Sequence, residues 1–267
     1  MLKGVTFDLW FTLLPSNRKL DSTWRKVRNH ETYHILLEHG YLFDYARLKK
    51  QIRLFDTQLQ EQRRIKGIDF NNDEQVDLFI DFVTHNGRKN RSLHDQIKET
   101  FTRPLLTYPP SLGEGVSEML ATLKADGWKI GLISNTGKTP GWTFRQLFDK
   151  WGISKYFEDC TFSDEAGAYK PNPRIFRMAE KQLKLQPSEL VHVGDMISAD
   201  ICGAIDAGWQ AIHFRRYLGL RYLDENARDA QVIDRCPPHE IVYTYPEIVE
   251  KLRLLRKQSG KGLHSCQ

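Results

Sequence analysis

Hydrophobic and polar positions follow different patterns in different parts of this 267-residue chain. Residues 3–14 begin with a nearly continuous apolar run, typical of a buried strand of a parallel sheet, and the run ends at Asp8. From about residue 15 to residue 110, apolar residues recur at spacings of three and four, which indicates amphipathic helices. After residue 111, short apolar runs alternate with helical segments, which predicts βαβ units around a parallel sheet.

The helical region is predicted to contain four helices. They cover residues 21–40, 44–64, 73–85 and 92–105. We interpret Asp21 as the N-cap of the first helix and Gly40 as its stop, because these residue types favour those positions. No strand-like alternation interrupts the region. It is therefore interpreted as an all-helical insertion that the breaker pair Pro109 and Pro110 closes.

The rest of the chain predicts a doubly wound sheet. Besides the strand before Asp8, strands are expected at residues 129–134, 159–162, 190–193 and 210–214, with a weak one at 231–233. Helices are expected at residues 113–127, 139–151, 173–183, 199–207 and 245–257. We therefore predict an α/β fold: a Rossmann-like doubly wound parallel sheet core from residues 1–14 and 111–258, with an inserted all-helical cap. The cap is expected at residues 15–110 and a flexible tail at 259–267.

Composition and charge narrow the class of protein. A chain that is 40% hydrophobic and 27% charged is typical of a globular protein, and no apolar run approaches the roughly 20 residues that span a bilayer. Asp8 would interrupt the apolar part of an export signal, so we expect a cytoplasmic protein without a membrane partner. The net charge of +5 could favour an anionic substrate. Basic residues are mixed with acids and form no stripe with aromatics, so we expect no nucleic-acid partner.

The four cysteines do not have the spacing of a metal site. They are Cys160, Cys202, Cys236 and Cys266. Neither a zinc site nor a disulfide framework is expected from them.

Polar side chains stand at the ends of three predicted strands. Asp8 ends the first, the turn 134–136 follows the second, and Asp195 follows a later one, with Asp200 five residues on. Because parallel strands bind ligands at their carboxyl ends, we expect these groups to meet, and Lys170 lies in a loop that could return to the same edge. Such a set suits a hard divalent cation such as Mg²⁺, which takes oxygen ligands and stabilises a transferring phosphoryl group.

Each of these residues also has an ordinary structural interpretation. Asp8 could be a turn residue, Asp195 could cap the helix that follows it, and Lys170 could be an exposed loop lysine. His192, on an apolar strand, is expected to be a core histidine with its hydrogen bonds satisfied.

The chain resembles the haloacid dehalogenase superfamily of hydrolases. The stretches FDLWFT, LISNT, YKPNP and VGDMISAD stand in the order of the four motifs of that superfamily, and the resemblance covers nearly the whole chain. The helical insertion after the first motif resembles the first cap class. The resemblance implies an enzyme that attacks its substrate with a carboxylate and forms a covalent aspartyl ester.

The resemblance also implies a role for each matching residue. Asp8 matches the nucleophile, and Ser134 and Lys170 match the residues that assist it. The positions that match substrate-binding residues are Thr12, Ser134, Asn135 and Lys170. The positions that match Mg²⁺ ligands are Asp8, Trp10 through its backbone carbonyl, Asp195 and Asp200. One bridging Mg²⁺ requires oxygens of Asp8 and Asp195 within roughly 6 Å of each other.

The chain departs from the phosphatase pattern at Trp10. Phosphatases of the superfamily have a second Asp there, which protonates the leaving oxygen and later activates water. An indole cannot transfer a proton at neutral pH, so a contribution of about 10²–10⁴-fold should be missing or supplied by another group. Candidates in the predicted cap are Glu31, His30 and His34.

The predicted function is that of a Mg²⁺-dependent phosphoric monoester hydrolase. It would act on a small phosphorylated metabolite through an aspartyl-phosphate, with activity weakened or narrowed by the loss of the second Asp. One alternative is a 2-haloacid dehalogenase, because halide leaves without a proton and that branch has a bulky aromatic residue at this position; it uses no metal, however, and lacks the later Asp pair.

Two further alternatives stay open. A phosphonate-cleaving enzyme also lacks the second Asp, but it requires a cap lysine to form an imine. Candidate cap lysines are Lys26, Lys49 and Lys66. The other alternative is a catalytically silent binding protein with the same fold, which only Trp10 favours.

Overall fold

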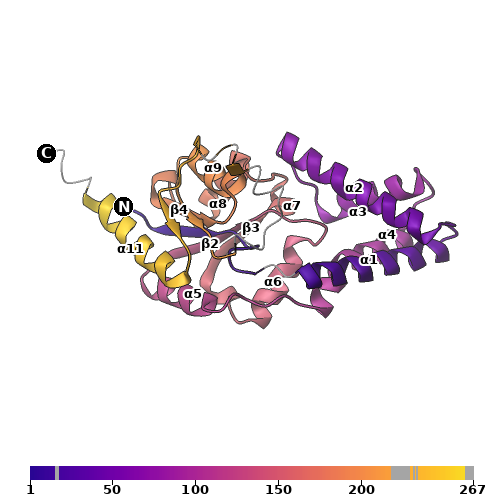
Figure 1. Cartoon of the computed structure of the whole chain (residues 1–267), viewed down its shortest axis with the longest axis horizontal. Coiled ribbons are helices and arrows are strands. Elements are labelled where there is room, and N and C mark those ends of the chain that lie inside the picture. Colours follow the sequence, from indigo (N-terminus) through magenta and orange to yellow (C-terminus); the bar gives the residue numbers. More distant parts are fainter. Residues whose placement is uncertain (16–17, 218–228, 231, 233, 262–267) are drawn as a thin grey trace.

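The computed structural model describes residues 1–15, 18–217, 229–230, 232 and 234–261. Its centre is a six-stranded parallel sheet with the strand order β3-β2-β1-β4-β5-β6 (Figure 1). The strands are β1 (Gly4–Phe7), β2 (Lys129–Ser134), β3 (Phe157–Phe162), β4 (Leu190–Gly194), β5 (Gln210–Phe214) and β6 (Glu240–Val242). The chain builds outward from β1 first to one side and then to the other, so β1 lies at the point where the strand order reverses. Open α/β sheets bind ligands at such a point.

Helices cover both faces of the sheet, as alternating strands and helices require. One face packs against α5 (Val116–Ala125), α6 (Gly141–Lys150) and α11 (Tyr245–Lys261) in a large hydrophobic cluster. The other face packs against α8 (Pro173–Leu183) and α9 (Cys202–Asp206). Short helical segments are α7 (Ser163–Ala166), η1 (Ser154–Tyr156), η2 (Pro187–Glu189) and the π-helix η3 (Ile197–Ile201). The predicted α/β fold with a Rossmann-like parallel sheet is confirmed.

Strand boundaries differ from the prediction in a few places. β3 begins two residues before the predicted start, and β4 extends by one residue to Gly194. The short edge strand β6 was not predicted, because it has only three residues and is largely exposed on one side. The weak strand expected at residues 231–233 falls on positions that lie mostly outside the described residues.

Four helices form a separate layer beyond the carboxyl edge of the sheet (Figure 1). They are α1 (Arg18–Glu38), α2 (Tyr45–Lys66), α3 (Asn72–Thr84) and α4 (Arg91–Thr107), and we call them the cap helices. They pack around a hydrophobic cluster of their own that includes Phe55, Phe79 and Phe101. The boundaries of core, cap and tail given above stay a prediction.

The ends of the cap helices follow from local capping. Asp44 accepts the backbone N–H groups of Ala46 and Arg47, and Gly67 ends α2 with a left-handed backbone at φ 62°. The prediction that Asp21 is an N-cap is wrong, because α1 begins at Arg18 and Asp21 lies within its first turn. An acid in that turn still interacts favourably with the helix dipole.

A core lysine inserts between the cap helices. Lys138, in the loop after β2, places its Nζ 2.6 Å from Oδ1 of Asp56 on α2. The same ammonium lies 5.0 Å from the ring centre of Phe79, 5.6 Å from that of Phe101 and 5.8 Å from that of Phe55. Cation–π contacts of this kind are strongest when they are shielded from water, and the side chain of Lys138 is only 9% exposed. Lys138 therefore ties the loop after β2 to the interior of the cap.

A buried polar cluster joins the end of α2 to the core. Nε of Arg63 donates to Oδ1 of Asp69 at 2.6 Å, and both side chains are almost completely buried. The other oxygen of Asp69 accepts from the hydroxyl of Ser163 at 2.5 Å and from Thr136 at 3.3 Å. Arg63 also donates to the carbonyl of Gly137 at 3.2 Å. These contacts fix the cap helices relative to the turn that follows β2.

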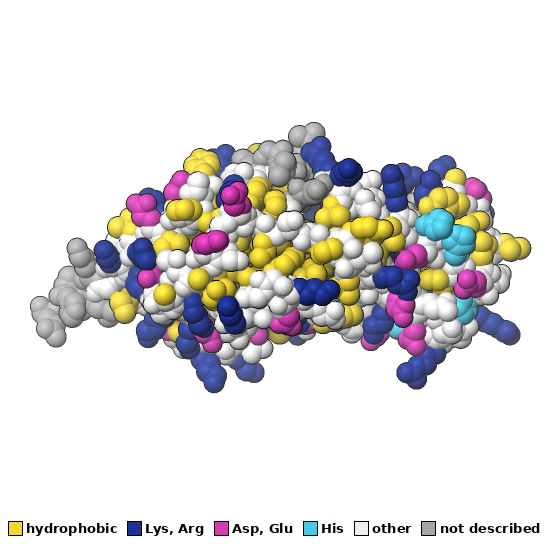
Figure 2. All heavy atoms as spheres, turned by 90° about the horizontal axis from the view of Figure 1, so that it is seen from below, with side chains coloured by type: hydrophobic (Ala, Val, Ile, Leu, Met, Phe, Trp, Pro, Cys, Tyr) yellow, Lys and Arg dark blue, Asp and Glu magenta, His cyan; other side chains and the backbone are white. Residues whose placement is uncertain are grey.

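Charged side chains are dispersed over the surface. On the face shown in Figure 2, hydrophobic side chains form a band across the middle, and Lys and Arg side chains are scattered without a continuous patch. Within the described residues, none of the helices combines the length and apolar character that a bilayer crossing needs.

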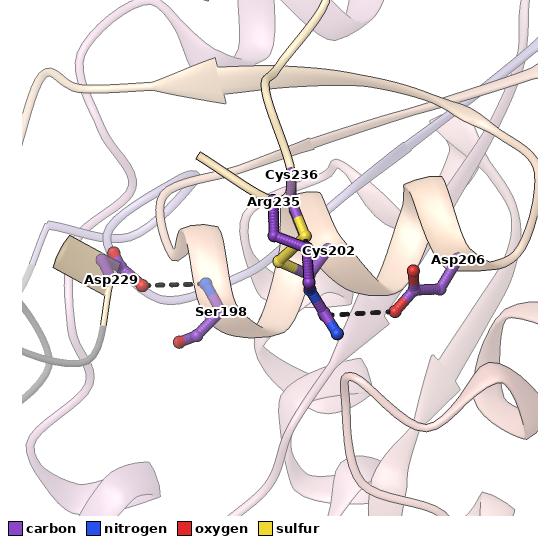
Figure 3. Close-up of a disulfide and its surroundings, with 6 residues drawn as sticks. All are labelled: Ser198, Cys202, Asp206, Asp229, Arg235 and Cys236. Carbon is purple, nitrogen blue, oxygen red and sulfur yellow. Dashed lines mark hydrogen bonds and ion pairs between the residues drawn. A yellow bond between two sulfur atoms is a disulfide. The ribbon is translucent and has the colours of Figure 1, made fainter. Parts of the chain in front are cut away.

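One disulfide contradicts the expectation from the cysteine pattern. Cys202, at the start of α9, is bonded to Cys236, and Ser198 and Asp206 of the same region contact Asp229 and Arg235 (Figure 3). The two cysteines are 34 residues apart, and they meet only because the chain returns across α9 after β5. Spacing along the sequence does not reveal that return. The bond fastens this later segment to the helix that follows Asp200.

Replacing Asp69 with Ala should cost the protein about 3–5 kcal/mol of unfolding free energy, because it leaves the guanidinium of Arg63 buried without its carboxylate. The double variant Arg63→Met with Asp69→Leu should lose less than this single variant, since no buried charge remains. Urea unfolding measures both.

The matched control is Asp73→Ala, which removes a largely exposed acid paired with Lys98 and should cost less than about 1 kcal/mol. Equal losses in Asp69→Ala and Asp73→Ala would show that the buried cluster does not hold the two layers together.

Candidate active site

Asp8 stands at the carboxyl edge of the sheet, immediately after β1. Its backbone N–H donates to the carbonyl of Val193 at 2.9 Å, which continues the pairing of β1 with β4 by one residue. The chain then turns sharply, with a left-handed backbone at Phe11 (φ 56°). Asp8 therefore lies between the ends of β2 and β4, where side chains from three segments can reach it.

Asp8, Asp195 and Asp200 form a buried group of carboxylates. Each offers one oxygen atom, and these three atoms lie within 4.8 Å of one another. Asp195 comes from the end of β4 and Asp200 from η3, which follows it. The oxygens of Asp8 and Asp195 are therefore closer than the roughly 6 Å that one bridging Mg²⁺ can span.

Lys170 connects two of these acids. Its Nζ lies 2.6 Å from Oδ1 of Asp8 and 2.6 Å from Oδ1 of Asp200, and it donates to the carbonyl of Ile133 at 2.7 Å. The side chain is only 2% exposed, so the interpretation as an exposed loop lysine is wrong. Burial by itself would lower the pKa of Lys170, but the two carboxylates together raise it above its ordinary value. The lysine is therefore a permanent cation in the site.

Asn135 holds the backbone of Lys170 in place. Its Oδ1 accepts the backbone N–H of Lys170 at 2.7 Å, and its Nδ2 donates to the carbonyl of Lys170 at 3.2 Å. This two-way contact joins the turn after β2 to the loop that carries the lysine. Asn135 is thus suited to positioning Lys170.

A chain of polar contacts orients Asp200. Its Oδ2 accepts the backbone N–H of Met196 at 2.9 Å, while Oδ1 accepts from Lys170 and lies 3.3 Å from Nε2 of His192. Nδ1 of His192 lies 2.8 Å from the hydroxyl of Thr6. His192 is therefore buried with its hydrogen bonds satisfied, as predicted, and also supports the site. Gly194 leaves room for the side chain of Asp200, because a Cβ at position 194 would collide with the Asp200 carboxylate.

The two acids that contact Lys170 have different acidities. Burial raises the pKa of Asp8 to about 7 against the opposing effect of Lys170, and nearby Asp200 adds to the rise. For Asp200, burial acts in the same direction, but Lys170 and His192 outweigh it and hold the pKa below its ordinary value. A metal ion bound beside Asp8, in addition to Lys170, would lower the pKa of Asp8 and favour its ionised form, which is the form that can attack a substrate.

Two predicted site residues lie slightly apart from this group. Ser134 is buried at the end of β2, and its Oγ donates to the carbonyl of Asn135 at 3.4 Å. Thr12 is also buried, and its carbonyl accepts from the hydroxyl of Tyr245 at 2.8 Å. Neither residue belongs to the described lining of the cavity above Asp8.

A cavity of ≈ 460 Å³ lies between the carboxylates and the cap helices. Its floor contains the three acids, Lys170 and Asn135, and its walls are partly aromatic. The other lining residues are Trp10, Phe11, Asp21, Trp24, Gln60, Arg64, Tyr169, Pro171, Met196, Ser198 and Ala199. The cap thus contributes residues from both α1 and α2 to a pocket that opens onto Asp8.

The aromatic residue in place of the second Asp packs against other rings. The ring of Trp10 lies 6.0 Å from that of Trp24 on α1 and 5.8 Å from that of Phe144 on α6, edge-on in both cases. Trp10 therefore joins the cap to the core through apolar contacts. Its side chain offers no carboxylate to the cavity.

None of the cap residues proposed to replace the missing acid lines the cavity. Glu31 contacts Arg103 at 3.3 Å, and His30 and His34 contact each other on the exposed side of α1. The cap lysines proposed for an imine are also absent from the described lining; they are Lys26, Lys49 and Lys66. The cap acid that does line it is Asp21. Helical spacing could have indicated that Asp21 faces the same side as Trp24, because residues three apart in a helix share a face.

A family model described as haloacid dehalogenase-like hydrolase matches residues 2–208 of the chain. The protein belongs to this family of hydrolases. The resemblance seen in the four motifs is confirmed at the level of the family, and the protein is therefore an enzyme of the hydrolase class.

Curated relatives agree with this membership. The chain is 28% identical over 247 residues to the glyceraldehyde 3-phosphate phosphatase of Methanopyrus kandleri, a match that covers 90% of this chain and 93% of that protein. It is 33% identical over 132 residues to the phosphoserine phosphatase of Thermus thermophilus, or 49% of this chain and 50% of that one.

The structure of a 2-haloacid dehalogenase from Pseudomonas syringae is also similar. It aligns with a TM-score of 0.68 over 96% of this chain and 100% of that chain, at 20% identity. At such an identity the likeness shows the fold alone.

Replacing Lys170 with Met should lower the free energy of unfolding by about 3–5 kcal/mol in EDTA, because Asp8 and Asp200 then face each other in a buried site without their ammonium. Mg²⁺ should restore part of the loss. Urea unfolding with and without Mg²⁺ measures both effects. The control Lys150→Met, at the exposed end of α6, should stay within about 0.5 kcal/mol of the wild type. A Lys170→Met protein as stable as this control would contradict the assignment of Lys170 as the internal counter-charge.

Proposed function

We propose that this hydrolase is a Mg²⁺-dependent phosphoric monoester hydrolase that acts on a small phosphorylated metabolite through an aspartyl-phosphate on Asp8. The observation that carries the proposal is the group of three buried carboxylate oxygens within 4.8 Å of one another, with Lys170 bridging two of the acids. The names of the curated relatives support a small phosphorylated substrate. A cavity of ≈ 460 Å³ is suited to a compact molecule.

The donor set fits Mg²⁺, which prefers carboxylate and carbonyl oxygens. Asp8 and Asp195 would hold the ion together with the backbone carbonyl of Trp10. Both oxygens of Asp200 already accept hydrogen bonds, so this acid is better suited to orienting Lys170 and the loop at Met196. When bound, Mg²⁺ would stabilise the charge on a transferring phosphoryl group.

The residues of the chain then have distinct tasks. The carboxylate of Asp8 attacks phosphorus and forms the ester, while the bond from phosphorus to the substrate's ester oxygen breaks and that oxygen takes up a proton and leaves as the alcohol. Lys170 screens the negative charge of the substrate from that of the nucleophile. Asn135 keeps Lys170 within reach of Asp8. Ser134 would bind a phosphoryl oxygen if its hydroxyl turned from the carbonyl of Asn135 toward the cavity. Water then attacks phosphorus and releases phosphate and free Asp8.

Dehalogenation is the second candidate function, and Trp10 is the observation that favours it. A bulky aromatic residue next to the nucleophile suits a halide, which leaves without a proton. Asp195 and Asp200 favour the phosphatase instead, because three carboxylates this close together are suited to binding a cation.

In Asp8→Asn, turnover of p-nitrophenyl phosphate should fall by more than about 10³-fold, because the nucleophile is lost. EDTA should abolish the wild-type activity and Mg²⁺ should restore it. Release of p-nitrophenol measures both, and Asp149→Asn at the exposed end of α6 serves as the matched control with unchanged activity.

The same preparations distinguish the alternatives. Halide release from 2-chloropropionate that is insensitive to EDTA, together with no phosphatase activity, would replace the proposal with a dehalogenase. No turnover of either substrate would indicate a binding protein that has lost its chemistry.

A further inference from the structure

The chemistry of the proposed phosphatase requires a proton donor that the first motif does not supply. An alkoxide is a poor leaving group, and a positioned acid accelerates its departure by about 10²–10⁴-fold. At position 10 the chain has an indole, whose ring packs against Trp24 and Phe144. A replacement acid would have to come from another residue that faces the same cavity.

We infer that Asp21 of the cap is the general acid and base of this hydrolase, in place of the aspartate that Trp10 replaces. This inference rests on the proposed phosphatase function. Asp21 lines the cavity that contains Asp8, and it is half-buried in the first turn of α1. It comes from a cap helix, whereas Asp8 and Asp195 follow strands of the sheet.

The position of Asp21 follows from that of Trp24. The two residues lie one helical turn apart on the same face of α1. Trp24 contacts the ring of Trp10, which is two residues beyond the nucleophile, and its own Nε1 donates to the carbonyl of Tyr108 at 2.9 Å. Trp24 is therefore fixed between cap and core, and the adjoining turn of α1 carries Asp21, which lines the same cavity as Trp10 and Asp8.

The other groups in the described lining are poorer proton donors. Asp8, Asp195 and Asp200 belong to the proposed nucleophile and metal group. The phenol of Tyr169 accepts from Gln60 at 2.6 Å, and a phenol loses its proton only near pH 10. Lys170 is held as a cation by two carboxylates. Among the lining residues of the described structure, Asp21 is the carboxyl group outside the metal cluster.

The proton is transferred twice in each cycle. An oxygen of Asp8 forms a bond to phosphorus, the bond from phosphorus to the ester oxygen breaks, and that oxygen keeps the electron pair and takes the proton of the Asp21 carboxyl group. The alcohol leaves. Water then attacks phosphorus and gives a proton to the Asp21 carboxylate, while the bond between Asp8 and phosphorus breaks. Phosphate leaves, and both acids return to their starting states.

The test compares two leaving groups in Asp21→Asn. For glycerol 3-phosphate, whose alkoxide needs a proton, kcat/KM should fall by about 10²–10⁴-fold. For p-nitrophenyl phosphate, whose leaving group is stable as an anion, kcat/KM should change by less than about threefold. The reason is that kcat/KM reports only the steps up to formation of the aspartyl ester, and these need no proton donor for this substrate. Hydrolysis of the ester should become slow, so p-nitrophenol should appear as a burst of about one equivalent per enzyme.

Two further variants separate catalysis from a structural role. Glu31→Gln, an acid on the same helix that does not line the cavity, should leave both substrates unaffected. Adding Trp10→Asp to Asp21→Asn should restore part of the activity on glycerol 3-phosphate. Thermal unfolding of each variant checks that helix α1 is intact, since one acid in the first turn of a helix stabilises it only weakly.

The outcomes are distinguishable. A loss of the same size for both substrates, or no loss for either, would overturn the assignment of Asp21 and leave the phosphatase proposal in place. A wild-type protein that hydrolyses neither substrate would overturn the proposed function and this inference together.

Discussion

The arrangement of the site depends on one buried ammonium between two carboxylates. Nζ of Lys170 lies 2.6 Å from both Asp8 and Asp200, and a third contact to the carbonyl of Ile133 completes its donors. Two acids would not remain ionised side by side in an interior that excludes water without such a partner. The lysine makes the group possible, and the parallel sheet makes the lysine effective, because Asp8 follows β1 and lies between the ends of the neighbouring strands β2 and β4.

The same edge of the sheet also fixes the cap. The turn after β2 carries Asn135, which positions Lys170, and then Thr136 and Lys138, which contact the cap. The turn after β2 therefore contributes both to the site and to the contact between the sheet core and the cap helices. A change in cap packing would be transmitted to the lysine through only a few residues. The cap is in this sense part of the site, and it provides the acid that the first motif lacks.

Much of this could be predicted from the sequence, for physical reasons. Asp8 and Asp195 follow apolar runs with strand character, and parallel strands bring their ends together, so their proximity was predictable. The contact of Lys170 with Asp8 was not predictable from periodicity, because the lysine lies in an irregular loop. Only the resemblance of its surroundings to a motif indicated it.

Other features depend on packing that the sequence does not reveal. Asp21 was interpreted as an N-cap because Asp favours that position, yet the helix begins three residues earlier and the acid faces the cavity. Glu31 is equally acidic but contacts Arg103, since the rotation of α1 against the core decides which side chains turn inward. The disulfide between Cys202 and Cys236 likewise depends on a chain return after β5.

The central claim is that one divalent cation is held between the first strand's acid and the acid after β4. Crystals soaked with Mn²⁺, which takes similar ligands and scatters anomalously, test it most directly. We expect a single strong anomalous peak in bonding contact with oxygens of both Asp8 and Asp195, at a distance close to the roughly 2.0–2.1 Å typical of Mg²⁺. A fully soaked crystal with no peak there, or with its peak bonded to only one of these acids, would contradict the account.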